Sequence, residues 1–196
     1  MPETQYRINT EDTATRTLRI MTNPPTAEFP GNATPAQLLY PDLADELAST
    51  RKMIAIVPEG HNDWKPHEKS MSLATLATHV AELAAFASIM LNTDELDMAT
   101  EDMSTKVLPT TAERLALFDK LSAEFSAAVE SADWQKLAGS WTLRMGPQVF
   151  LTGQKATLLR TLGISHIAHH RAQLGVYLRQ LGVPIPGCYG PSADEM

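Results

Sequence analysis

The sequence is short of cysteine, and this shortage excludes an internal disulfide bond. Cys188 is the single cysteine among 196 residues. A chain that folds without disulfide bonds suits a reducing compartment, although a secreted protein with few cysteines has the same pattern. We therefore expect a cytoplasmic protein.

Basic residues are also scarce relative to acidic ones. The chain has 16 lysines and arginines against 23 aspartates and glutamates, which gives a formal net charge of −7. Proteins that bind duplex DNA need clustered basic side chains to neutralise phosphates, and anionic membrane surfaces attract the same residues. The charge balance disfavours nucleic acid and membrane as partners, and we expect a small-molecule substrate.

Long apolar runs are missing as well. The N-terminus has neither the basic start nor the apolar stretch that is typical of a signal peptide. The most apolar window, LATLATHVAELAAFASIML, contains His79 and Glu82. Because no window reaches the length of about 18 uncharged apolar residues, we expect no transmembrane helix.

The composition changes near residue 33. Residues 1–33 are rich in threonine, asparagine and proline, and we expect them to form an extended N-terminal arm. Residues 34–196 have the length of one domain with a substantial core. We predict that this part of the chain is a single all-α domain.

Four amphipathic helices are predicted in residues 34–196. Thr34 and Thr110 each begin a helix-start pattern, with Gln or Glu three residues later. The alternating stretch WTLRM…VFL predicts a short β-hairpin near 140–152. The fold class is therefore a four-helix bundle with long crossover connections. The predicted helices cover residues 34–57, with a break at Pro41, and residues 70–92, 110–133 and 155–181.

Three histidines carry the main functional signal. His166 and His170 are one helical turn apart, so both imidazoles lie on one helix face. His79 lies inside the apolar stripe of the predicted 70–92 helix. If these two helices face each other, three imidazoles can bind one divalent metal ion and leave positions open for chemistry. The pair is not a zincin motif, because Ile167 stands where that motif has its catalytic glutamate.

A histidine on an apolar helix face is more often a hydrogen-bonded core residue than a metal ligand. Three buried imidazoles would leave several ring nitrogens without partners, at about 1–3 kcal/mol for each unsatisfied group. A metal ion satisfies three of these nitrogens together. The residues alone favour the metal site over a metal-free bundle and leave both open.

Several polar residues surround the histidine pair. Gln173 and Tyr177 follow His170 by one and two turns, so either could orient a bound ligand or the second nitrogen of a histidine. A polar edge of the core is an equal alternative for them. We expect His169 to hydrogen-bond across the bundle or to a partner subunit, and Arg171 to form a salt bridge at the surface.

Two segments resemble the signature segments of the DinB/YfiT-like superfamily of metalloenzymes. They are DWKPHEKSMSLATLATHVAEL and HIAHHRAQLGVYLRQLGVPIPGCYGPSADE, and Ala172 stands where the family has glycine. The resemblance implies a four-helix bundle, often a homodimer. It also implies one divalent metal ion, Zn²⁺ first with Ni²⁺ or Fe²⁺ as alternatives. His79, His166 and His170 match the family's three ligands.

The resemblance further implies metal-dependent chemistry on a small molecule. One option is a thiol-dependent S-transferase that uses a low-molecular-weight thiol, and the other is a hydrolase. The reactive group would be a metal-bound thiolate or water, with Gln173 and Tyr177 as possible support. The alternative is a non-catalytic, metal-stabilised dimeric helical bundle that acts as a binding module. A fourth protein ligand would close the site in that case.

Overall fold

The computed structural model describes residues 32–101 and 106–196. Residues 1–31, which make up most of the predicted arm, lie outside the described residues. Three strands are Glu95–Asp97 (β1), Ser140–Met145 (β2) and Gln148–Gln154 (β3). The helices are Pro35–Leu39 (α1), Leu43–Ala55 (α2), Leu73–Glu82 (α3), Ala85–Asn92 (α4), Thr111–Glu130 (α5), Trp134–Ala138 (α6), Lys155–Leu158 (α7), the π-helix Leu159–Ser165 (η1) and His166–Gln180 (α8).

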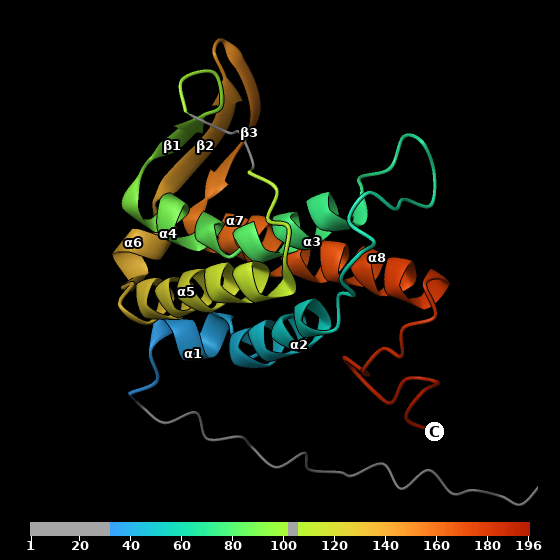
Figure 1. Ribbon diagram of the computed structural model, residues 1–196. Helices are drawn as coiled ribbons and strands as arrows, with labels where there is room; N and C mark the ends of the chain where they lie inside the picture. The colour runs from blue at the N-terminus through green and yellow to red at the C-terminus, as the bar shows by residue number, and fades with distance from the viewer. Residues whose placement is uncertain (1–31, 102–105) are drawn as a thin grey trace, which may run out of the picture. The chain divides into compact units, whose positions relative to one another are not determined.

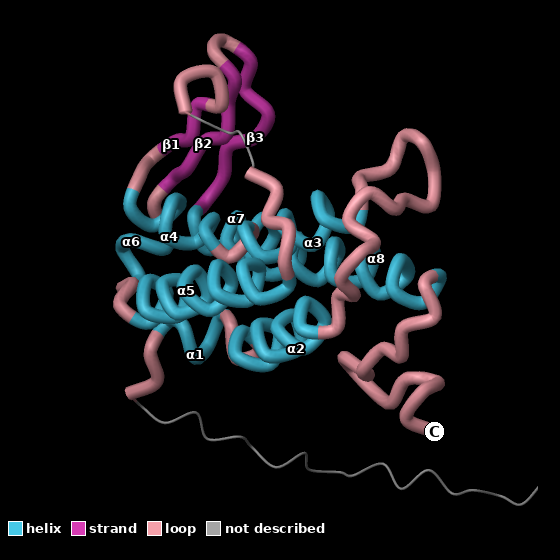
Figure 2. Tube along the Cα trace, viewed as in Figure 1, coloured by secondary structure: helices cyan, strands magenta, loops and turns pink. Residues whose placement is uncertain are grey.

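The long helices of residues 33–196 form a bundle, as Figures 1 and 2 show. Helices α2 and α3 are consecutive long helices, and both pack against α5 and α8. The predicted helical fold is therefore confirmed. The core between the helices is apolar, and its fully buried members include Ile54, Leu76, Phe118, Phe125 and Leu174.

Helix starts follow the signals in the sequence. The Thr34 hydroxyl accepts a hydrogen bond from the Gln37 amide, and the Thr110 hydroxyl accepts one from the Glu113 amide. Each cap satisfies backbone donors that have no partner inside the helix. The predicted break near Pro41 is confirmed, because α1 ends at Leu39 and α2 begins at Leu43.

The prediction of one continuous helix over residues 70–92 was wrong. Helices α3 and α4 meet at Leu83 and Ala84, and their axes differ by 41°. Both linking residues are buried, so the bend keeps the apolar faces of both halves against the core. No proline or glycine marks this break in the sequence. Within the described residues no single helix is long and apolar enough to cross a bilayer, and the bent pair α3–α4 reaches that length only when its halves are counted together.

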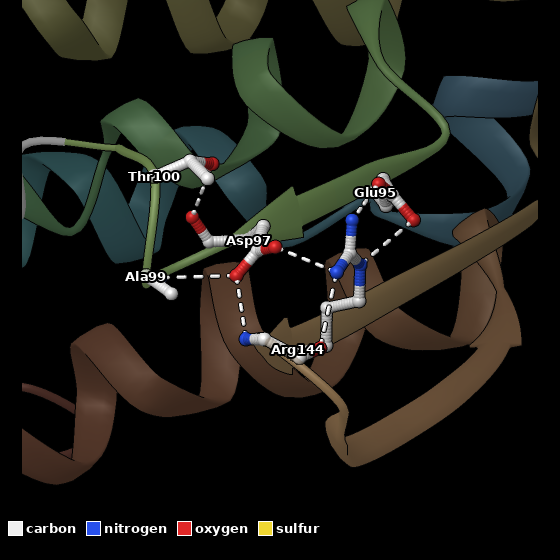
Figure 3. A network of polar contacts seen from close by, with 6 residues as sticks. Glu95, Asp97, Ala99, Thr100 and Arg144 are labelled. Atoms are coloured by element: carbon white, nitrogen blue, oxygen red, sulfur yellow. Dashed lines mark hydrogen bonds and ion pairs between the residues drawn. The ribbon is translucent and has the colours of Figure 1, made fainter.

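A small sheet stands beside the bundle. Strands β2 and β3 pair antiparallel, which confirms the predicted hairpin, and Gly146 turns between them with a φ of +54°. The sequence did not predict β1, which pairs parallel to β2. Arg144 of β2 connects to β1 through ion pairs of 2.6 Å to Glu95 and to Asp97 (Figure 3). The Asp97 carboxylate also accepts a hydrogen bond from the Gly146 amide.

The last predicted helix begins as expected at Lys155 but contains a π-helical stretch. Helix η1 covers the seven residues before His166. The hydrogen bonds of a π-helix span one more residue than those of an α-helix, so the π-helical stretch changes the rotation of the residues that follow it. Gly163 lies in this stretch, and a Cβ there would come within 3.1 Å of the Phe125 ring. The absence of a side chain at Gly163 lets the Phe125 ring of α5 lie this close to η1.

The predicted surface salt bridge of Arg171 was wrong in its location. Arg171 is 2% exposed and pairs with the Glu46 carboxylate of α2 at 2.8 Å. It also donates to the Thr50 hydroxyl and, at 2.7 Å, to the Tyr189 hydroxyl of the C-terminal segment. These partners permit the burial, since a charge that is paired and hydrogen-bonded can enter a core.

Candidate metal site

The structure brings His79, His166 and His170 together. His79 comes from α3, and the other two come from the first turns of α8. Their candidate ligand atoms all lie within 4.8 Å of one another. The Nε2 atoms of His166 and His170 are 2.9 Å apart, and the His79 ring centre lies 4.6 Å from that of His170. The three rings thus surround one small volume.

Helix packing explains this convergence. His79 occupies a position in the apolar stripe of α3, between Leu76 and Leu83, which are both 1% exposed. Helix α3 packs along α8, so the stripe faces the start of α8. The π-helical stretch ends at Ser165, and it determines the direction in which the His166 and His170 side chains extend from α8.

The site favours neutral imidazoles. Burial is the largest cause that lowers the pKa of His79 to about 4, and the positive charges that His170 and His166 would carry contribute to the same shift. Burial is also the largest cause of the lowered pKa values of His166 and His170. Each ring therefore has a lone pair near neutral pH, and this is the form that binds metal ions.

A divalent metal ion fits these residues. The Nδ1 atom of His166 is buried without a hydrogen bond of good geometry, and the cluster within the described residues consists of histidines alone. Three imidazole nitrogens suit Zn²⁺, Ni²⁺ or Fe²⁺ far better than Mg²⁺ or Ca²⁺, which prefer oxygen. The role of the three residues as ligands stays a prediction.

A cleft of about 380 Å³ adjoins His170. Its walls are mainly apolar, with Gln173 and Tyr177 as polar members on α8. The lining residues contain no Lys, Arg, Asp or Glu. They are Ser70, Met71, Leu76, His170, Gln173, Val176 and Tyr177.

Gln173 and Tyr177 make different contacts from each other. The Gln173 side-chain oxygen lies 2.8 Å from His170 Nδ1, and its nitrogen lies 3.1 Å from His169 Nε2. The Tyr177 hydroxyl donates to the Met71 carbonyl at 3.3 Å, and its ring meets the Trp64 ring edge-on at 5.4 Å. Gln173 thus contacts a cluster histidine, whereas Tyr177 fixes the loop that walls the cleft.

The loop residues of the cleft were not predicted from the sequence. His169 bonds within its own helix to Gln173, one turn away. Its bond to a partner subunit stays a prediction. Ser70 and Met71 line the cleft because Leu73 and Ala74 donate backbone hydrogen bonds to Trp64 and Asn62. No spacing in the sequence indicates such loop contacts.

A family model and a relative from Bacillus subtilis match most of this chain. The DinB family model matches residues 31–196. The uncharacterized protein YrdA of Bacillus subtilis is 30% identical over 155 residues, which cover 76% of this chain and 85% of that protein.

Solved structures show a similar fold. The DinB-like protein YjoA of Bacillus subtilis has a TM-score of 0.59 at 18% identity, covering 76% of this chain and 96% of its own. YfiT of Bacillus subtilis, described as a probable metal-dependent hydrolase with an unusual four-helix bundle topology, has a TM-score of 0.56 at 12% identity. That match covers 80% of this chain and 94% of YfiT.

Proposed function

The chain belongs to the DinB family, and on that premise we propose that it is a metal-dependent enzyme that hydrolyses a small molecule. His79, His166 and His170 would hold one divalent ion, with Zn²⁺ as the first candidate. The observation that carries the proposal is the cluster of three imidazoles whose ligand atoms lie within 4.8 Å of one another. The description of YfiT as a probable metal-dependent hydrolase favours hydrolysis.

The site supports catalysis better than a purely structural ion. A structural zinc site is closed by four protein ligands, whereas a catalytic one has three and stays open. Within residues 32–101 and 106–196 the cluster offers three ligands, and a cleft adjoins His170. When bound, such an ion supplies Lewis acidity toward a water molecule or a carbonyl oxygen.

The cleft indicates what the chain's own residues do for a substrate. Met71, Leu76 and Val176 present apolar surface that excludes water and accepts an uncharged group. The Ser70 hydroxyl is a polar group of this lining that can orient it. The absence of charged side chains from this lining favours a neutral substrate over a phosphorylated one.

Three earlier expectations stay predictions. They are thiol-dependent transfer, the homodimer and the cytoplasmic location. The alternative, a non-catalytic metal-stabilised bundle, differs from the enzyme in one observable feature. In that case a protein side chain would occupy the fourth position on the ion.

The test uses untagged protein, which avoids nickel from an affinity column. Wild-type protein, His170→Ala and the exposed-loop control His61→Ala are dialysed against zinc and then buffer, and their metal is measured by elemental analysis. We expect about one equivalent in wild type and the control, and loss in His170→Ala. Hydrolysis of p-nitrophenyl acetate should follow the metal content. Equal zinc in His170→Ala and wild type would contradict the proposal.

A further inference from the structure

Three side chains form a hydrogen-bonded row along the exposed face of α8. His170 Nδ1 lies 2.8 Å from the Gln173 side-chain oxygen, and the Gln173 side-chain nitrogen lies 3.1 Å from His169 Nε2. Gln173 and His169 are exposed, whereas His170 is half-buried in the cluster. The row therefore links the surface to one ring of the candidate metal site.

The chemistry of each atom fixes where the protons are. An amide oxygen only accepts, so His170 must carry its proton on Nδ1. An amide nitrogen only donates, so His169 must accept at Nε2. A neutral imidazole has one proton, and His170 Nε2 is therefore left with a lone pair. This nitrogen is the one that lies 2.9 Å from His166 Nε2 inside the cluster.

The reverse orientation of the amide would disfavour metal binding. With the Gln173 nitrogen toward His170, Nδ1 would have to accept and Nε2 would carry the proton. That proton would point into the cluster and occupy the lone pair that a metal ion needs. In the structure the Gln173 oxygen faces His170 and the nitrogen faces His169. The second bond, to His169, reduces the freedom of the amide to rotate away from His170.

We infer that Gln173 and His169 are positioning residues that hold His170 in its Nδ1-protonated tautomer and so keep its Nε2 ready to bind a metal ion. The metal-binding part of this inference rests on the proposed function, whereas the tautomer does not. His169 acts through its hydrogen bond to Gln173. A histidine on the surface is in this way part of the site.

The decisive readout is the tautomer of His170 in metal-free protein. Long-range ¹H–¹⁵N correlation spectra distinguish a protonated Nδ1 from a protonated Nε2, at a pH well above the usual histidine pKa of about 6.5. We expect the Nδ1-protonated form in wild type. Gln173→Met, which keeps the length but removes the acceptor, should populate the other tautomer. Gln173→Glu, which keeps an acceptor, should restore the wild-type form.

Zinc affinity provides the second readout. Residues that orient a ligand typically contribute tenfold to a hundredfold to metal affinity, so Gln173→Met should weaken zinc binding by about that factor. His169→Ala frees one side-chain amide and should weaken it by about twofold to fivefold. Gln180→Ala, an exposed glutamine of the same helix, is the matched control and should change neither readout.

The results separate this inference from the proposed function. A His170 ring that stays Nδ1-protonated in Gln173→Met would overturn the role of Gln173. His169→Ala that matches Gln180→Ala in both readouts would overturn the role of His169. Protein that binds no zinc but whose His170 tautomer follows Gln173 would overturn the proposed function and leave the positioning row in place.

Discussion

Removing the buried charge of Arg171 should destabilise the protein strongly. The arginine side chain is 3% exposed and its partner Glu46 is 11% exposed, with 2.8 Å between the paired atoms. Arg171→Met leaves the Glu46 carboxylate buried with the Tyr189 hydroxyl as its remaining side-chain donor, at 3.1 Å. Breaking a buried pair from one side costs about 3–5 kcal/mol. For a chain of this size, that corresponds to a decrease in Tm of about 6–20 °C.

The double variant tests the physical reason. Replacing both partners, as in Glu46→Leu with Arg171→Met, removes the unpaired charge, and buried pairs replaced by apolar residues are often close to neutral. We expect most of the lost stability to return. The assay is urea unfolding of metal-free protein followed by circular dichroism, which gives the free energy of unfolding of each variant.

A surface pair provides the control. Arg51 and Asp119 are 2.7 Å apart, but their side chains are 51% and 46% exposed. Arg51→Met should therefore lower the free energy of unfolding far less than Arg171→Met. If Arg171→Met is as mild as Arg51→Met, or if the double variant is no more stable than Arg171→Met, the reasoning about the buried charge is refuted.

Two further predictions concern the site. The pKa of His79 is lowered to about 4 in the folded protein, against an ordinary value of about 6.5, so the unfolded chain binds a proton that the folded chain does not. The free energy of unfolding of metal-free protein should therefore fall as the pH falls from about 6.5 to 4, by about 1–2 kcal/mol after discounting for the partly exposed ring. In urea titrations, His79→Leu should lack this pH-dependent loss of stability. Gly163→Ala places a methyl carbon 3.1 Å from the Phe125 ring, so the ring or η1 must shift, and because η1 positions His166 the variant should bind zinc more weakly in competition with a chelator dye. Unchanged affinity in this variant would show that the contact with Phe125 does not position η1.

The parts of the fold that sequence reasoning found are those with local signals. The threonine caps at Thr34 and Thr110 mark helix starts, because a cap depends on residues within three positions. The alternation around Trp141 marks the hairpin for the same reason. His166 and His170 were assigned to one face because their separation equals about one helical turn.

The parts that it missed depend on contacts between distant residues. The bend at Leu83 has no proline or glycine, and β1 is a three-residue strand held by Arg144 from another segment. Arg171 was placed at the surface because it points away from the histidine pair, whereas Glu46 and Thr50 of α2 provide the partners that permit its burial. Sequence alone also does not indicate the π-helix before His166, in which Gly163 lies against Phe125.

The coordination of zinc by the three histidines can be measured by X-ray absorption at the zinc edge of untagged, zinc-loaded protein. If His79, His166 and His170 bind the ion, the spectrum should show three imidazole nitrogens at about 2.0–2.1 Å from it, together with an oxygen ligand that is not a protein side chain. The imidazole signal should be lost with the bound zinc in His170→Ala. A zinc ion bound by sulfur or carboxylate, or an imidazole signal that is unchanged in His170→Ala, would contradict the assignment of His79, His166 and His170 as the metal ligands.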